Sequence, residues 1–355
     1  MTNEVLQVHD GASRPAQVTW IGHATVLVEL AGVRLLTDPL LTDRVAHLRR
    51  RRSGAEVDLS TVDAVLISHL HVDHLHLRSL RQLGTHTLVV VPRGAGTWLR
   101  SRGIERVEEL SVGEHLDIGV VQVLAVPALH GDRRGPHSRV RAAPLGFVIG
   151  SGEGSVYFAG DTDLMPEMAE LRGVEVALLP IWGWGPTLGT GHLDPLRAVT
   201  AAERIDPGLV VPIHWGTFSP LRLRPGPPHW LDTPAELLRR SLETSRLRDR
   251  FTLCLPGESV LVDRSGPPGR FAPLPVAPSG QQVADGDACG QDQAQHTPDR
   301  EVGLEPENVH GDPFTVLQQE DHGHQAQRAG ADLPAAGTKA VTGATGRTSG
   351  YGHRR

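Results

Sequence analysis

The feature that most constrains this chain of 355 residues is a run of histidine and aspartate that directly follows an apolar strand. The strand covers Ala64 to Ile67, and the run reads Ser68-His69-Leu70-His71-Val72-Asp73-His74-Leu75-His76. His69 and His71 are two residues apart, so in an extended strand end their side chains point the same way. We expect Asp73 and His74 to lie in the first turn of the helix that follows.

Four potential ligands therefore converge within six residues of this run. Neutral imidazole and carboxylate are ligands that zinc and similar divalent ions accept. Two adjacent pairs of such ligands predict two metals rather than one. The alternative is a solvated turn that happens to be rich in histidine, and the clustering of four potential ligands within six residues argues against it.

The run has the form His-x-His-x-Asp-His, and on it the chain resembles the metallo-β-lactamase fold hydrolases. That family takes further ligands from loops at strand ends, and the sequence has a candidate after each of three later strands: His130, Asp161 and His214. The resemblance implies an α/β fold, an αββα sandwich of two packed mixed sheets with helices outside.

Within the family the chain is most similar to the N-acyl-phosphatidylethanolamine-hydrolysing phospholipase D branch, and more distantly to L-ascorbate-6-phosphate lactonase. The similarity covers about residues 17 to 262. Besides the ligand run, it is carried by these segments: Thr19-Trp20-Ile21-Gly22-His23-Ala24-Thr25, Leu36-Thr37-Asp38-Pro39, Ala159-Gly160-Asp161-Thr162, Gly191-His192-Leu193-Asp194-Pro195 and His214-Trp215-Gly216-Thr217-Phe218.

The resemblance also implies a ligand set for two divalent ions, with zinc expected and manganese or iron fitting the same nitrogen and oxygen donors. One ion would be held by His69, His71 and His130. The other would be held by Asp73, His74 and His214, with Asp161 bridging the two. Such a pair of ions deprotonates a bridging water, and the resulting hydroxide is the expected nucleophile, with Asp73 and Asp161 counted among the catalytic residues.

The function implied by this centre is hydrolysis of a phosphodiester, with a small-molecule or lipid-derived phosphoester as substrate. A lactonase or other acyl-ester hydrolase is the alternative within the fold, because the same hydroxide can attack a carbonyl. An alternative of another class is a non-catalytic metal-binding module. A diiron electron-transfer relative is disfavoured because no flavin domain is evident. The sequence leaves open whether the chain forms a homo-oligomer.

Three residues near the motifs are expected to support the ligands. His192 is the candidate to bind or protonate the leaving phosphate, although the phospholipase has glutamine where this chain has Gly191. His23 is expected to be buried and hydrogen-bonded beside the ligands rather than to be a ligand itself. Asp38 is a candidate acceptor for the outer nitrogen of a ligand histidine.

Aromatic and basic residues near the motifs have two interpretations each. Trp182, Trp184 and Trp215 either line the substrate pocket or pack in the core. Arg49 to Arg52 either attract the phosphate of a substrate or form a solvated loop, and the loop is favoured. The arginines after His130 are better candidates for anion contacts: Arg133, Arg134, Arg139 and Arg141. His76, His86, His115 and His137 match no motif and are expected at the surface.

Composition excludes several other classes of protein. A hydrophobic fraction of 39% allows a packed core, and a net charge of −6 argues against nucleic acid as a partner. No apolar run reaches the length of a membrane span, and residues 1–10 have no apolar segment typical of a secretory signal. With only two cysteines, neither a disulfide framework nor a thiolate zinc site is expected. A cytoplasmic protein is the prediction.

The chain divides into an expected hydrolase domain over residues 1–264 and a low-complexity, disordered tail over residues 265–355. Apolar alternation predicts these strands: Val18–Gly22, Thr25–Leu30, Val33–Thr37, Ala64–Ser68, Leu88–Pro92, Val120–Val126, Leu145–Ile149, Val156–Gly160, Val176–Pro180 and Leu209–Ile213. Helices are predicted over Leu75–Leu83, Gly94–Arg102, Leu164–Leu171, Pro195–Arg204 and Pro234–Leu247.

Overall fold

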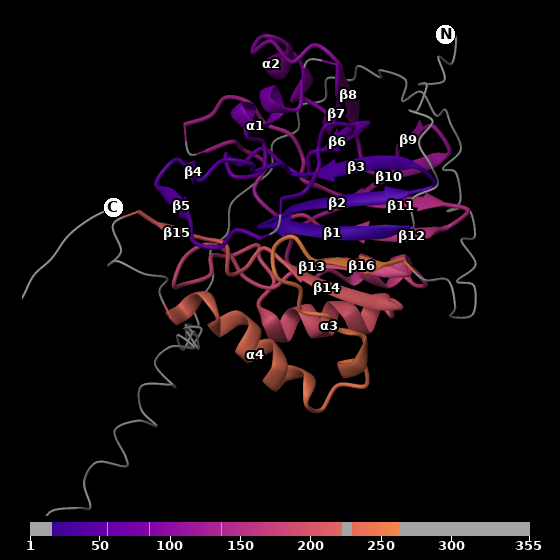
Figure 1. Cartoon of the computed structure of the whole chain (residues 1–355), viewed down its shortest axis with the longest axis vertical. Helices are drawn as coiled ribbons and strands as arrows, with labels where there is room; N and C mark the ends of the chain where they lie inside the picture. Colours follow the sequence, from indigo (N-terminus) through magenta and orange to yellow (C-terminus); the bar gives the residue numbers. More distant parts are fainter. Residues whose placement is uncertain (1–15, 55, 85, 136, 222–228, 263–355) are drawn as a thin grey trace, which may run out of the picture. The chain divides into compact units, whose positions relative to one another are not determined.

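The computed structural model describes residues 16–262, apart from 55, 85, 136 and 222–228. Two mixed sheets form the inner layers, with the strand orders β16-β1-β2-β3-β6-β7-β8 and β14-β13-β12-β11-β10-β9, and a small third sheet has the order β15-β5-β4. Helices α1 and α2 lie at one end of the view in Figure 1, and α3 and α4 lie at the other. This is the predicted αββα sandwich. The predicted tail from residue 265 falls outside the described residues.

The strands are short, and most of them are buried. The first sheet contains β1 (Gln17–Gly22), β2 (Thr25–Leu30), β3 (Val33–Thr37), β6 (Ala64–Leu66), β7 (Leu88–Pro92), β8 (Val107–Leu110) and β16 (Ser259–Leu261). The second contains β9 (His115–Ile118), β10 (Val121–Pro127), β11 (Leu145–Ser151), β12 (Gly154–Phe158), β13 (Val176–Pro180) and β14 (Leu209–Ile213). The third contains β4 (Arg44–Val45), β5 (Leu48–Arg50) and β15 (Phe218–Pro220).

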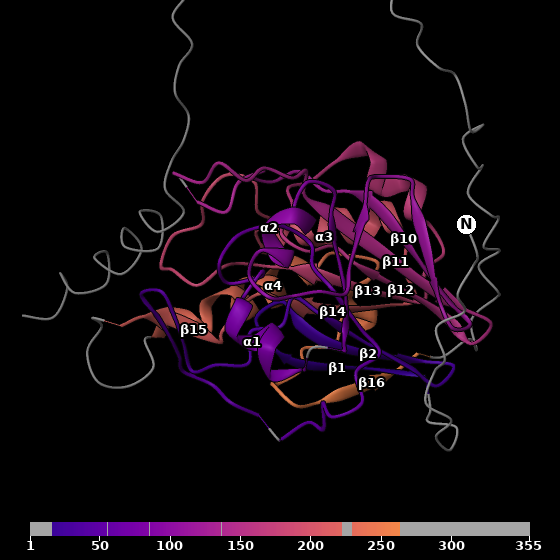
Figure 2. The ribbon, with the colours of Figure 1, turned by 90° about the horizontal axis from the view of Figure 1, so that it is seen from above.

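The helices pack against the two sheets, which Figure 2 shows from above with β1, β2 and β16 on one side and β10, β11 and β12 on the other. Their bounds are α1 (Leu77–Gln82), α2 (Gly96–Arg100), α3 (Pro195–Ile205) and α4 (Thr233–Leu242), with 3₁₀ helices η1 (Pro166–Leu171), η2 (His229–Leu231) and η3 (Arg248–Arg250). On the first sheet, Leu80 of α1 and Leu99 of α2 pack with Val65 and Val89 in one buried cluster. On the second, α3 packs against β13 and α4.

All ten predicted strands are present, but six short ones were not predicted: β4, β5, β8, β9, β15 and β16. These have two to four residues each, too few for alternation to stand out. The predicted helix over Leu164–Leu171 is the 3₁₀ helix η1. The helix predicted over Pro234–Leu247 begins at Thr233, after Asp232 as its N-cap, and ends at Leu242.

Strand direction brings the loops of the predicted site together. In the first sheet β1, β3 and β6 run the same way, because β2 is antiparallel to both of its neighbours and β3 is parallel to β6. In the second sheet β10, β12, β13 and β14 run the same way by the same reasoning. The carboxyl ends of these strands therefore meet at one edge of each sheet.

The two edges are joined by backbone hydrogen bonds between the sheets. The His214 N–H donates to the His23 carbonyl over 2.9 Å, and the Leu145 N–H donates to the Ser68 carbonyl over 2.8 Å. Gly160 has a φ of +61°, and a Cβ there would lie 2.5 Å from the Ser68 Cβ, so only glycine allows this approach. The loops after β6 and β12 are thereby held in contact.

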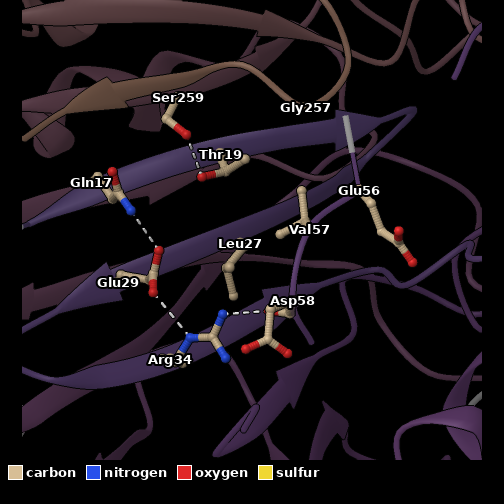
Figure 3. A pocket seen from close by; sticks show the side chains of 10 residues that line it. All are labelled: Gln17, Thr19, Leu27, Glu29, Arg34, Glu56, Val57, Asp58, Gly257 and Ser259. Carbon is tan, nitrogen blue, oxygen red and sulfur yellow. Dashed lines mark hydrogen bonds and ion pairs between the residues drawn. The ribbon is translucent and has the colours of Figure 1, made fainter. Parts of the chain in front are cut away.

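A pocket of about 340 Å³ lies elsewhere, over β1 and β2 and beside residues 56–58 (Figure 3). It contains the cross-strand pair Glu29 and Arg34, in which Arg34 Nε donates to Glu29 Oε1 over 3.0 Å. Gln17 Nε2 donates to the other oxygen of Glu29 over 2.7 Å. Both charged side chains are buried, so the pair replaces the hydration that each charge has lost.

Removing one partner of this pair should be costly. Arg34→Met is expected to lower the free energy of unfolding by about 3–5 kcal/mol, because Glu29 stays buried without its guanidinium. Replacing both residues with methionine should recover most of the loss. Arg246, whose Nη1 lies at the same 3.0 Å from Asp206 on the surface, is the matched control, and Arg246→Met should cost under about 1 kcal/mol. Urea unfolding that gives equal losses for the two single variants would contradict this account.

Candidate metal centre

The ligand run forms a loop ahead of α1 rather than the start of the helix. The prediction that Asp73 and His74 lie in the first helical turn is wrong, because α1 begins at Leu77. The His74 and Leu75 N–H groups donate to the His71 carbonyl, which closes a tight turn. His76 ends this turn and caps the helix, accepting from the Ser79 N–H through Nδ1. His76 was predicted at the surface, and it is half-buried there as the cap of this helix.

Three imidazoles form the first of two groups of converging nitrogens. His69 Nε2 lies 2.9 Å from His71 Nδ1, and His130 Nε2 lies 3.0 Å from the same atom. His130 comes from the loop after β10, so the second sheet completes a group begun by the first. The structure brings together the three residues predicted to hold one ion.

The second group contains the residues predicted to hold the other ion. His74 Nε2 and His214 Nε2 are 3.2 Å apart, and Asp73 Oδ2 lies 3.9 Å from His74 Nε2. Asp161 lies between the groups. Its Oδ2 is 3.2 Å from His74 Nε2 and about 4 Å from the Nε2 atoms of His69 and His130, and its Oδ1 is 3.2 Å from His214 Nε2.

Hydrogen bonds on the outer side of the rings set which nitrogen faces inward. His74 Nδ1 lies 2.7 Å from Asp38 Oδ2, and His214 Nδ1 lies 2.9 Å from the Trp182 carbonyl. His130 Nδ1 lies 2.8 Å from the Gly191 carbonyl. Carboxylate and carbonyl oxygens only accept, so each of these Nδ1 atoms carries a proton, and each ring in its neutral form turns its Nε2 lone pair inward.

His69 is oriented in the same way through Ser68. The Ser68 hydroxyl donates to Asp38 Oδ2 over 2.5 Å, so its oxygen is left to accept from His69 Nδ1 at 2.9 Å. The Ser68 N–H donates to the other oxygen of Asp38 over 2.8 Å. Asp38, fully buried at the end of β3, thus orients one histidine of each group. The sequence singled out Asp38, whereas Ser68 had no signal other than its place before His69.

Lone pairs that face one another at these distances repel unless a cation lies between them. His71 Nδ1 can donate a proton to only one of its two histidine neighbours, and Asp161 Oδ1 has no hydrogen-bond donor among the described residues. Metal–ligand bonds of about 2.0–2.1 Å would place donor atoms about 2.9–3.4 Å apart. The shortest separations within each group fall in this range, so the residues fit divalent metal ions.

The shifts in the histidine pKa values agree with a site that binds divalent metal ions. Burial and the neighbouring His74 hold the pKa of His69 well below its usual range. Burial, together with His130, lowers the pKa of His71 to about 4, and burial lowers that of His214 to about 3. These rings are neutral at pH 7, the form that binds metals. Burial opposes a raised pKa at His74, but Asp161 and Asp38 outweigh it, so a proton there occupies the place of a cation.

His192 lies at the open side of the two groups. Its Nε2 is 3.4 Å from Asp161 Oδ2, and its Nδ1 lies 3.2 Å from the carbonyls of Gly189 and Thr190. The side chain is 20% exposed, whereas that of Asp161 is 3% exposed. Burial lowers the pKa of His192, but the hydrogen bond to Asp161, the charge of Asp161 and the carbonyls of Gly189 and Thr190 together outweigh burial and raise it.

Gly191, which stands where the phospholipase has glutamine, has a structural role here. Its φ is +77°, and a Cβ would lie 3.1 Å from His130 Nδ1. Glycine therefore allows the backbone carbonyl to come close enough to orient His130.

The tryptophans divide between core and rim. Trp215 is buried and stacks on Trp20 at 5.6 Å between ring centroids. Trp182 is buried, and its Nε1–H donates to the Gly185 carbonyl. Trp184 is half-buried, with its ring 4.9 Å from that of His47. Of the two interpretations, packing in the core therefore describes Trp182 and Trp215 better than lining a substrate pocket does.

The arginines after His130 do not converge on the ligands as a group. Arg134 Nη1 donates to the carbonyls of Leu70 and Leu75, so it secures the ends of the ligand loop instead of offering an anion site. Arg141 pairs with Asp132 at 3.1 Å. Of the earlier basic run, Arg50 donates to the Leu40 carbonyl and stacks on Phe218, and Arg52 pairs with Asp232 at 2.6 Å.

Comparison with known proteins gives a consistent family. The profile of the beta-lactamase superfamily domain matches residues 33–215. A UPF0173 metal-dependent hydrolase of Methanopyrus kandleri is 35% identical over 250 residues, which cover 68% of this chain and 98% of that protein.

None of the helices in the described part of the chain has the length and apolar character needed to cross a bilayer.

Two solved structures share the fold. Igni18, a metallo hydrolase from Ignicoccus hospitalis, matches 70% of this chain and 98% of its own with a TM-score of 0.53 and 24% identity. An isothiocyanate hydrolase from Delia radicum gut bacteria matches 69% of this chain and 98% of its own with a TM-score of 0.55 and 19% identity. At these identities the likeness establishes the fold and not the substrate.

The depressed histidine pKa values predict that the metal-free protein loses stability as the pH falls below about 6.5. An unfolded histidine takes up a proton near that pH, whereas His214 resists protonation down to a pKa of about 3. The unfolded state then binds more protons, so the free energy of unfolding should fall by up to about 1.4 kcal/mol per pH unit for each such histidine. Urea unfolding of the chelator-treated protein between pH 6.5 and 4 measures this slope. His214→Asn should make the slope shallower, and a stability that does not change with pH would contradict the assignment.

Proposed function

Because the chain belongs to the beta-lactamase superfamily, and within it to the UPF0173 metal-dependent hydrolase family, we propose that it is a binuclear metal-dependent phosphodiesterase. One ion would be held by His69, His71 and His130. The other would be held by Asp73, His74 and His214, with Asp161 between them. Zinc suits these donors best, and manganese or iron fits the same set.

The proposal rests first on the arrangement of donors in this chain. Every imidazole of the set is buried or half-buried, and four of them have an outer nitrogen held by an oxygen acceptor. When bound, two divalent ions would supply Lewis acidity for a phosphoryl oxygen and lower the pKa of a bound water. The chain itself supplies fixed ligands, with the side chain of Asp161 3% exposed and that of His192 beside it 20% exposed.

Charge favours an anionic substrate over a neutral lactone or ester. Two divalent ions carry four positive charges, and Asp73 and Asp161 offset two of them. The remaining positive charge would attract a phosphodiester, which carries one negative charge. A lipid-derived or small-molecule phosphoester meets this requirement equally well.

His192 is the observation that carries the choice of reaction. Its Nδ1 faces two carbonyl oxygens, which fixes the proton there, and its Nε2 faces the space beside Asp161 on the exposed side. A protonated Nε2 in that position can donate to the leaving oxygen as its bond to phosphorus breaks. Asp161 beside the ring holds the proton until it is needed.

The substrate class is tested by a panel of phosphodiester, lactone and thioester substrates with the metal-loaded protein. We expect turnover of the phosphodiester. Turnover of only the lactone or thioester would support an acyl hydrolase instead. A protein that binds metal and hydrolyses none of the three would support a non-catalytic module.

The role of His192 is tested by leaving groups of different basicity. His192→Ala should reduce kcat by about 10²–10⁴ for a phosphodiester with an alkyl alcohol as leaving group, which needs a proton. It should reduce kcat far less for a p-nitrophenyl ester, whose leaving group needs none. His115→Ala, at an exposed position of β9, is the control that should change neither rate. Equal losses on both substrates would show that His192 only binds the phosphate.

A further inference from the structure

His23 lies beside the second ligand group, although the sequence placed it outside the ligand set. It follows β1, and its side chain is 3% exposed. Its Nε2 lies 3.2 Å from Asp73 Oδ2, and its ring centroid lies 4.1 Å from that of His214. One donor atom each from His23, Asp73, His74 and His214 lies within 4.8 Å of all the others.

The ring of His23 has no hydrogen-bond partner among the described residues, at either nitrogen. The nearest carboxylate oxygen is Asp73 Oδ2, 3.2 Å from His23 Nε2, and this contact helps to lower the pKa of Asp73. A buried polar group left without a partner is costly, and it is rare in folded proteins. Four predicted histidine ligands, by contrast, have an outer nitrogen satisfied.

The backbone holds His23 in this position against a conformational preference. Its φ is +57°, in the left-handed region that non-glycine residues seldom adopt. The His23 N–H donates to Thr217 Oγ1 over 3.0 Å, and its carbonyl accepts from Trp20 Nε1 over 2.8 Å and from the His214 N–H over 2.9 Å. Three backbone hydrogen bonds thus fix a strained residue whose buried ring contacts a predicted metal ligand, and strained residues of this kind cluster at functional sites.

We infer that His23 is a direct ligand, through Nε2, of the metal held by Asp73, His74 and His214; this inference rests on the binuclear centre proposed above. The 3.2 Å between His23 Nε2 and Asp73 Oδ2 is the separation expected of two donors on one ion. With Asp161, this ion would have five protein ligands, whereas the ion at His69, His71 and His130 would have four. The two halves of the centre are then unequal, and the half with His23 favours an ion that accepts five or six ligands.

Direct ligation has a spectroscopic signature that positioning does not. In the full chain loaded with ¹¹³Cd²⁺ and labelled with ¹⁵N-histidine, Nε2 of His23 should show a one-bond coupling to cadmium. The signal is assigned by its disappearance in His23→Gln. Absence of that coupling while other site histidines show theirs would overturn the inference.

Titration of the metal-free chain with Zn²⁺ provides the second measurement. His23→Gln and His23→Ala should each weaken one of the two binding steps by at least about 100-fold. Glutamine can still donate an N–H to Asp73, so recovery of wild-type affinity in His23→Gln would show that His23 only positions Asp73, against the inference. His115→Gln is the matched control and should leave both steps unchanged. Should the wild type bind fewer than two ions, the binuclear proposal itself fails, which is a different outcome from an unchanged His23→Gln.

Discussion

The carboxylate of Asp38 is the interaction on which the arrangement of the site depends. It accepts from His74 Nδ1, from the Ser68 hydroxyl and from the Ser68 N–H, and all of these groups are buried. Through them one carboxylate sets the orientation of His74 directly and of His69 by way of Ser68. Asp38 itself has a φ of +33°, so the backbone turns sharply after β3 to aim it inward. Without this acceptor, the two rings would have no fixed lone pair to present.

The sandwich serves to bring such oriented donors from two sheets to one place. Strands that run the same way in each sheet end at a common edge, and the loops after β1, β3 and β6 there meet the loops after β10, β12 and β14. The contact between Gly160 and Ser68 and the hydrogen bond between His214 and His23 set how closely the edges approach. Neither sheet contains a complete ligand group, so the site exists only in the folded chain.

Much of this was predictable from the sequence, for identifiable reasons. The core strands are apolar and long enough for alternation to be visible, and the ligand run directly follows one of them. The sandwich and the convergence of ligands were predicted from the family that this run resembles. The ligands so predicted are His69, His71, Asp73, His74, His130, Asp161 and His214. The start of α1 was not, because the turn after His71 is closed by backbone hydrogen bonds that leave no pattern in side-chain type. The contacts of Arg134 and His76 with the ligand loop and the helix cap were missed for the same reason. The position of His23 depends on its positive φ, and the residue type alone does not indicate that a histidine adopts this backbone angle.

The central claim is that the converging lone pairs form a binuclear metal centre, and the metal content of the purified protein tests it most directly. The full chain, incubated with zinc and freed of loosely bound ions by dialysis, should retain about two equivalents by elemental analysis. Asp161→Ala, which removes the carboxylate between the two groups, should retain markedly less while remaining folded by circular dichroism. A folded wild-type protein that retains no metal, or an Asp161→Ala variant that retains two equivalents, would contradict the account.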